Sequence, residues 1–253
     1  MPVITVKKRG VHIQELNTAA AETLVLVHGM FSNLSVYYFN IAPILAKHFH
    51  VVMYDLKSHG LSERTSGGYD LESMTDDLSD LLDQLNLKSV HLAGYSFGGL
   101  IALKMAARFP ERVKKLAIIE APDPGDDKTR DIIDDYSREF LEHYVTNFTD
   151  TTKVKMGKRQ MERNHRMYEY LFHETTIKSD MIKERDFFTA AEIAAIPQEA
   201  LLLYGKESNC LSAGKWLKNR IKKVEMLEVD GDHNVPIQQP VSIGNLMETF
   251  FKN

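Results

Sequence analysis

The chain has 253 residues, 43% of them hydrophobic, and a formal net charge of −4. This length allows a sizeable core and fits one domain with an insertion better than two domains. The slight acidity gives no basis for nucleic-acid binding, and the single cysteine, Cys210, excludes a disulfide framework and a cysteine-rich metal site. The sequence has no apolar run of signal-peptide or membrane length. We therefore expect a cytoplasmic protein without a membrane span or a nucleic-acid partner.

Short apolar runs of strand length recur along the chain. The first two, residues 3–6 and 11–16, flank Arg9-Gly10 and predict an opening hairpin. Six more predicted strands follow, at residues 23–27, 50–54, 89–93, 113–119, 200–204 and 224–229. Amphipathic helical patterns separate most of them, the best at residues 70–85. This alternation predicts an α/β fold with a mostly parallel central sheet and helices on both faces.

The alternation stops after Glu120. From residue 121 to 197 there is no convincing buried strand, but helical patterns run through residues 129–148 and 151–172. We expect residues 121–197 to form an inserted helical cap, and residues 1–120 and 198–253 to form the core domain.

The stretch Gly94-Tyr95-Ser96-Phe97-Gly98 lies between a predicted strand and a predicted helix. A sharp turn at this junction holds the serine in a strained conformation that only small neighbours tolerate, and Gly94 and Gly98 provide that room. The start of the following helix also offers unpaired backbone N–H groups. The pattern predicts that Ser96 is a nucleophile.

Four segments together resemble the α/β-hydrolase superfamily. His28-Gly29-Met30 is similar to the family's oxyanion loop, residues 55–62 to its Asp-x-Arg-Gly-x-Gly-x-Ser turn, residues 94–98 to its nucleophile turn, and Gly231-Asp232-His233 to its Gly-x-His. The second segment departs from the family in having Lys57-Ser58 where Arg-Gly is usual. The resemblance implies the α/β-hydrolase fold with an inserted helical cap.

A serine hydroxyl needs a base to take its proton, and histidine suits that task because its pKa is about 6.5. Of the ten histidines, His233 follows the last predicted strand, and the resemblance makes it the base. By the same resemblance, His28 and His59 shape loops.

A third residue, a carboxylate, should orient the imidazole. In most relatives it follows the strand equivalent to residues 201–204, but Ser208 occupies that position here. Some relatives carry the acid after the strand that follows the nucleophile helix, where this chain has Glu120. We favour Glu120, with Glu207 as the alternative acid. The remaining candidates are Asp123, Asp230 and Asp232.

The resemblance also implies the oxyanion hole, made by the backbone N–H groups of Met30 and Phe97. We expect a substrate pocket lined by Phe31, Tyr95, Phe140 and Tyr144.

These expectations describe a serine hydrolase that cleaves a carboxylic ester or thioester of a small molecule through an acyl-enzyme. Hydrolysis of lactones or carbon–carbon bonds, acyl transfer, and a low-turnover receptor remain alternatives. We expect no metal or organic cofactor, because no histidine–carboxylate cluster has ligand spacing and no G-x-G-x-x-G follows the first strands. A basic run could meet the phosphates of acyl-coenzyme A or a carrier protein, and it comprises Lys153, Lys155, Lys158, Arg159, Arg163 and Arg166.

Overall fold

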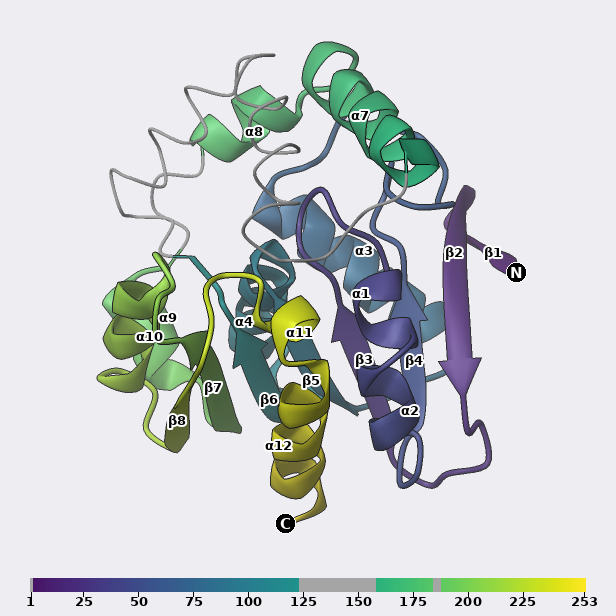
Figure 1. Cartoon of the computed structure of the whole chain (residues 1–253). Coiled ribbons are helices and arrows are strands. Elements are labelled where there is room, and N and C mark those ends of the chain that lie inside the picture. The colour runs from purple at the N-terminus through teal and green to yellow at the C-terminus, as the bar shows by residue number, and fades with distance from the viewer. Residues whose placement is uncertain (1, 123–157, 184–187) are drawn as a thin grey trace.

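The computed structural model describes residues 2–122, 158–183 and 188–253 (Figure 1). Its centre is an 8-stranded sheet in the order β1-β2-β4-β3-β5-β6-β7-β8. β1 pairs antiparallel with β2 and β2 antiparallel with β4, whereas the other neighbours are parallel. The mostly parallel α/β sheet expected from the sequence is therefore confirmed.

All eight predicted strands are present. Their bounds are β1 Val3–Val6, β2 Arg9–Leu16, β3 Thr23–Val27, β4 His50–Tyr54, β5 Val90–Tyr95, β6 Val113–Ile119, β7 Glu199–Gly205 and β8 Val224–Val229. The central strands β3 to β7 consist almost entirely of buried residues, as expected for parallel strands covered on both faces.

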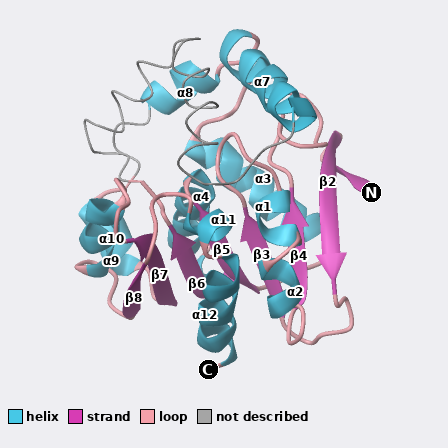
Figure 2. Cartoon of the chain, viewed as in Figure 1, coloured by secondary structure: helices cyan, strands magenta, loops and turns pink. Residues whose placement is uncertain are grey.

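Helices cover both faces of the sheet, which gives three layers (Figure 2). The helices that the structure describes are α1 Ser35–Tyr38, α2 Ile41–Leu45, α3 Leu71–Gln84, α4 Phe97–Arg108, α7 Lys158–His173, α8 Ile177–Lys183, α9 Ala190–Ala195, α10 Leu211–Lys218, α11 Val235–Gln238 and α12 Pro240–Lys252, with a short 3-10 turn at Pro110–Arg112. One hydrophobic cluster lies between the sheet and α3 and α4, and a second lies between the sheet and α1, α2 and α12. Asp70 caps α3 by accepting a hydrogen bond from the backbone N–H of Ser73.

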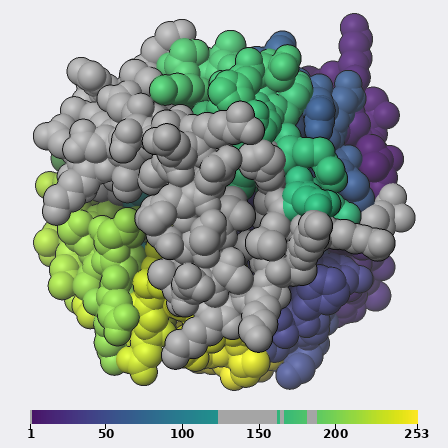
Figure 3. All heavy atoms as spheres, turned by 45° about the horizontal axis from the view of Figure 1, so that its top comes forward, coloured from purple at the N-terminus to yellow at the C-terminus, as the bar shows by residue number. Residues whose placement is uncertain are grey.

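Helices α7, α8 and α9 lie between β6 and β7 in the chain, and α7 and α8 sit beyond the carboxyl ends of the parallel strands (Figure 1). Two hydrogen bonds join α7 and the turn after it to the loop before α3. Tyr170 Oη donates to the Thr65 carbonyl (3.2 Å), and the Thr176 N–H donates to the Ser66 carbonyl (2.9 Å). The space-filling view shows the same neighbourhood, with α7 beside the N-terminal third of the chain (Figure 3). The predicted helix 129–148 lies outside the described residues, and the division into core and cap stays a prediction.

Among the described helices, none combines the length and the apolar composition that crossing a bilayer requires.

Candidate active site

Ser96 sits in a strained turn between β5 and α4. Its backbone has φ 54° and ψ −123°, a region that L-residues rarely adopt, and its side chain is partly exposed. The turn needs both flanking glycines. A Cβ on Gly94 would lie 2.1 Å from the Gly98 carbonyl oxygen, and one on Gly98 would lie 2.3 Å from the Val27 carbonyl oxygen. Neither glycine can carry a side chain unless the backbone moves.

Three side chains from distant parts of the sequence form a hydrogen-bonded line at this turn. Ser96 Oγ lies 3.1 Å from His233 Nε2, and His233 Nδ1 lies 3.2 Å from Glu120 Oε2. Ser96 follows β5, Glu120 follows the adjacent strand β6, and His233 lies in the loop after β8. The Ser96 N–H also donates to the Ile119 carbonyl (2.8 Å), so the ends of the two strands are tied together.

Glu120 is fully buried and well supplied with hydrogen-bond donors. Its side chain is 0% exposed, Oε1 accepts from the Gly205 N–H, and Oε2 accepts from Ser208 Oγ as well as facing His233. Its backbone is also left-handed, at φ 54°. Because an unpaired buried carboxylate is costly, these donors make a buried, ionised Glu120 tenable.

The second acid candidate, Glu207, has an exposed side chain, and its N–H donates to the Gly231 carbonyl (3.0 Å). The adjacent Ser208, at the usual acid position of the family, donates to Glu120. Ser208 is not a carboxylate, and its contact with Glu120 could not be predicted from the sequence because it depends on how β6 and β7 pair.

The minor acid candidates lie elsewhere. Asp230 is exposed and forms an ion pair with Lys206 (2.6 Å), whereas Asp232 accepts from the backbone N–H of Asn234 (2.7 Å). Asp123 lies outside the described residues.

His233 has two further neighbours besides Ser96 and Glu120, which are Tyr95 and Cys210. Tyr95 Oη donates to the His233 carbonyl (3.0 Å), and the two rings lie 5.4 Å apart. Cys210 Sγ lies 3.4 Å from His233 Nδ1, a contact that the sequence did not predict. Partial burial lowers the pKa of His233, but hydrogen bonding to Cys210 and Glu120 outweighs it and raises that pKa overall.

Two buried neutral histidines shape the loop that follows β3. His28 Nδ1 donates to the Gly29 carbonyl (2.7 Å) and His28 Nε2 accepts from the Leu56 N–H (2.9 Å). His59 Nδ1 donates to the Lys57 carbonyl (2.8 Å), and its Nε2 accepts from the Phe31 N–H (3.1 Å). Burial lowers the pKa of both rings, that of His59 to about 3. Both are therefore held in one neutral tautomer by the loop they support.

This loop approaches the serine turn closely, since a Cβ on Gly29 would lie 2.9 Å from the Ser96 Cβ. Met30 follows at once in the chain, and Phe97 is the first residue of α4, where backbone N–H groups lack acceptors within the helix. The two expected oxyanion donors thus belong to segments that meet beside Ser96.

Asp55 ties the neighbouring loops together. Its Oδ1 accepts from the Leu34 N–H (2.8 Å), and its Oδ2 accepts from the Leu61 N–H (2.8 Å) and from His12 Nδ1 (2.7 Å). Asp55 is 2% exposed. The unusual Lys57 of this turn is also buried, and it pairs with Asp77 (2.9 Å).

Of the four expected pocket residues, two are described. Phe31 packs against Tyr168 and Phe172 of α7, with ring centroids 5.1 and 5.2 Å apart, and Tyr95 lies beside His233. Phe140 and Tyr144 lie outside the described residues. In the basic run, Arg163 and Arg166 are exposed on α7, whereas the described parts of the structure do not cover Lys153, Lys155 or the side chains of Lys158 and Arg159.

Comparisons with known proteins agree with this architecture. A family model described as "alpha/beta hydrolase fold" matches residues 22–171. The chain is 27% identical over 243 residues to the AB hydrolase superfamily protein YisY of Bacillus subtilis, covering 90% of both chains. It is 37% identical over 102 residues to the putative carbamate hydrolase RutD of Pantoea ananatis, which is 40% of this chain and 37% of the relative. The chain thus spans about a third of the length of the first curated relatives it matches.

Among solved structures, the enol-lactonase of Burkholderia xenovorans LB400 superposes with a TM-score of 0.78 at 21% identity and covers 100% of both chains. At this level of identity the likeness bears on the fold alone. Since the family model matches more than half of its residues, this chain belongs to the α/β hydrolase fold family.

Proposed function

We propose that this protein is a serine hydrolase that cleaves a carboxylic ester or thioester of a small molecule through an acyl-enzyme. The observation that carries the proposal is the line from Ser96 Oγ to His233 Nε2 (3.1 Å) and from His233 Nδ1 to the fully buried Glu120 (3.2 Å). Such a line supplies a nucleophile, a base and a group that orients the base.

In the first half of the reaction, Ser96 Oγ attacks the substrate carbonyl carbon while His233 Nε2 takes the hydroxyl proton. The carbonyl oxygen becomes an oxyanion, which the N–H groups of Met30 and Phe97 would stabilise, each donor contributing about 2.7–4 kcal/mol. Glu120 stays ionised and stabilises the imidazolium. The imidazolium then gives its proton to the leaving alcohol or thiol, which leaves the acyl group on Ser96.

In the second half, a water molecule attacks the acyl-enzyme and gives its proton to His233 Nε2. The second tetrahedral intermediate collapses, the proton returns to Ser96 Oγ, and the carboxylic acid leaves. Both halves use the same base and oxyanion donors, so one arrangement serves two steps.

The relatives of this chain suggest further substrate classes to test beside esters and thioesters. The chain resembles the putative carbamate hydrolase RutD over 40% of its length and shares its fold with an enol-lactonase, so carbamates and lactones belong in the substrate panel. An acyl-coenzyme A or carrier-protein partner has no support from the comparisons and is not part of the proposal.

The test combines active-site labelling with turnover. A fluorophosphonate probe should label the wild-type protein and the control Ser242→Ala, which changes an exposed serine of α12, but not Ser96→Ala. The same variants are assayed on p-nitrophenyl esters, thioesters, carbamates and lactones, and on diketones to test for hydrolysis of a carbon–carbon bond. We expect Ser96→Ala to lower kcat on the best substrate by about 10⁴-fold or more. Labelling without turnover of any substrate would overturn the proposal in favour of a receptor.

A further inference from the structure

The hydrogen-bonded line does not use Cys210, although its sulfur lies within the site. Cys210 is 9% exposed and precedes α10, and its Sγ lies 3.4 Å from His233 Nδ1. Ligand atoms of Glu120, Cys210 and His233 all lie within 4.8 Å of one another. A carboxylate, a thiol and an imidazole thus converge on one point on the side of His233 that faces away from Ser96.

We propose that Glu120, Cys210 and His233 form a binding site for Zn²⁺, and that the bound ion inhibits the hydrolase. These three donor types are the usual protein ligands of Zn²⁺. The part of the proposal that concerns inhibition rests on the proposed function, whereas the part that concerns metal binding does not.

The distances suit a tetrahedral ion. Nitrogen, oxygen and sulfur atoms bound to one Zn²⁺ at about 2.0–2.3 Å lie roughly 3.3–3.7 Å apart along the edges of a tetrahedron. His233 Nδ1 lies 3.2 Å from Glu120 Oε2 and 3.4 Å from Cys210 Sγ, and all three ligand atoms lie within 4.8 Å of one another. Binding therefore requires the Glu120 and Cys210 ligand atoms to approach each other by no more than about 1 Å. A fourth position would be left for water.

The charges also balance. A Cys210 thiolate and the Glu120 carboxylate together neutralise one divalent cation in a buried place, and the thiol proton passes to solvent. The Gly205 N–H and the Ser208 hydroxyl already hold Glu120, which is the outer support that metal-binding carboxylates usually have. The His233 side chain is 28% exposed, which gives the ion a way in.

The mechanism of inhibition follows from the imidazole tautomer. Nδ1 must give up its proton to bind the ion, so the single proton of the neutral ring then resides on Nε2. In that state Nε2 donates to Ser96 Oγ and cannot accept its proton. Zinc would thus inhibit the enzyme without touching the serine or the substrate.

The first test uses metal alone and requires no turnover. Co²⁺ is titrated into the protein, and the near-ultraviolet charge-transfer band of a cobalt–thiolate bond is recorded. We expect the band in the wild type, in Ser96→Ala and in Ser212→Ala, a control at an exposed residue of the same helix α10. We expect no band in Cys210→Ala. The absence of the band from Ser96→Ala, or from wild type, would overturn the site whatever the enzyme's activity.

The second test measures inhibition as a ratio within each variant. Ester hydrolysis is followed with Zn²⁺ and after addition of EDTA. Removing one of three ligands should raise the half-inhibitory Zn²⁺ concentration at least about 10-fold in Cys210→Ala relative to wild type and Ser212→Ala. Equal zinc sensitivity of Cys210→Ala and wild type would show that inhibition arises elsewhere and would overturn the proposal.

Discussion

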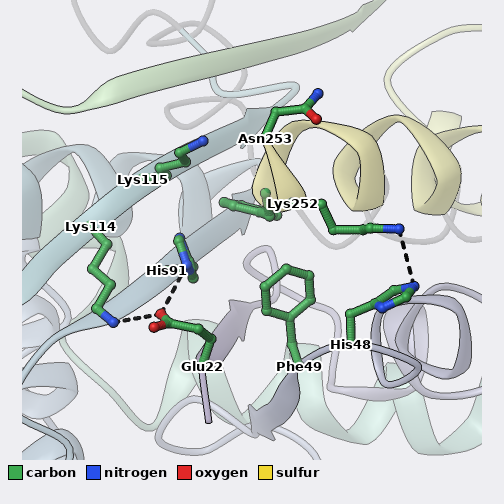
Figure 4. A pocket seen from close by; sticks show the side chains of 9 residues that line it. Glu22, His48, Phe49, His91, Lys114, Lys115, Lys252 and Asn253 are labelled. Atoms are coloured by element: carbon green, nitrogen blue, oxygen red, sulfur yellow. Dashed lines mark hydrogen bonds and ion pairs between the residues drawn. The ribbon is translucent and has the colours of Figure 1, made fainter. Parts of the chain in front are cut away.

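A histidine lies next to a glutamate both at the carboxyl ends and at the amino ends of the parallel strands. The two pairs differ in how deeply the glutamate is buried. At the carboxyl ends of the strands, His233 faces the fully buried Glu120. At the amino ends, His91 of β5 faces Glu22, whose side chain is 48% exposed, with Nε2 and Oε2 3.4 Å apart (Figure 4). Lys114 Nζ lies 2.5 Å from Oε2 of the same carboxylate. Figure 4 shows the side chains of His91 and Lys114 directed at Glu22.

The surroundings shift the pKa values of His91 and His233 in opposite directions. Burial lowers the pKa of His91, Glu22 offsets this only in part, and Lys114 and Lys115 lower it further. Burial also acts to lower the pKa of His233, but its hydrogen bonds outweigh that and the pKa is raised. A histidine–glutamate contact is therefore not a site by itself, because the donors and charges around it decide what the imidazole can do.

Removing the charge of Glu120 should have the largest effect on activity. Glu120→Gln keeps the shape of the side chain but no longer stabilises the imidazolium or fixes the tautomer, so we expect kcat for ester hydrolysis to fall by about 10⁴-fold. The matched control Glu207→Gln, one residue before Ser208, should stay within about twofold. Near-normal turnover in Glu120→Gln, with circular dichroism showing a folded protein, would refute its assigned role.

His59 tests whether the pKa of a histidine depends on its contacts or on which end of the strands it occupies. His59 lies at the same edge as His233, yet burial lowers its pKa to about 3. In the unfolded chain, His59 has a pKa near 6.5 and is protonated as the pH falls below that value, while in the folded protein it stays neutral. Protonation therefore favours the unfolded state, and stability that is present above pH 6.5 is lost on acidification. One such group removes about 2–3 kcal/mol between pH 6.5 and 4.5.

Urea unfolding at these two pH values measures the loss. His59→Gln should be less stable than wild type at pH 6.5 but should lose less stability on acidification. His173→Gln, at an exposed histidine of α7, should retain the wild-type difference. Parallel losses in His59→Gln and wild type would contradict a neutral, buried His59.

A smaller effect is expected when the support of Glu120 is removed. Ser208→Ala deletes the hydroxyl that donates to Glu120 Oε2. A hydrogen bond to a charged group contributes about 1.5–3 kcal/mol, so kcat should fall about 10- to 100-fold while KM changes little. Ser208→Thr retains a hydroxyl and should recover part of the activity. An unchanged kcat in Ser208→Ala would mean that the Gly205 N–H alone suffices.

The smallest effect is expected from a change of Glu22, at the amino ends of the strands. Glu22→Gln weakens a partly exposed ion pair with Lys114, so the free energy of unfolding should change by less than about 1 kcal/mol. Ester hydrolysis should stay within about twofold of wild type. A loss of activity comparable to that of Ser208→Ala would show that the amino ends of the strands affect the site around Ser96, which would contradict the independence of the two histidine–glutamate pairs.

The sequence predicted the sheet well because its strands are continuous apolar runs bounded by turns, a signal that needs no tertiary information. Ser96 could be singled out for a similar reason, since Gly94 and Gly98 mark a turn that no other residues fit. The role of Ser208 and the position of Cys210 could not be predicted. Both depend on β7 lying beside β6, although 79 residues, 120–198, lie between those two strands in the chain.

Glu120 lies between these extremes. The strand before it was predictable, and the resemblance offered two positions for the acid. What the sequence did not contain was the pairing of its N–H with the Leu203 carbonyl (3.0 Å), which brings Glu120 beside Gly205 and Ser208. Local patterns thus predict elements, whereas contacts between elements need the folded sheet.

The backbone bond from Ser96 to Ile119 has a mechanical consequence. Because the residues that carry the hydroxyl and the carboxylate end two hydrogen-bonded neighbouring strands, the separation between their backbones is the fixed spacing of the sheet, about 4.8 Å per strand. Only the imidazole rides on a loop. We therefore expect a mutation that weakens the pairing of β5 with β6 at this end to change the distance between Ser96 and Glu120, and so to slow ester hydrolysis before it unfolds the protein.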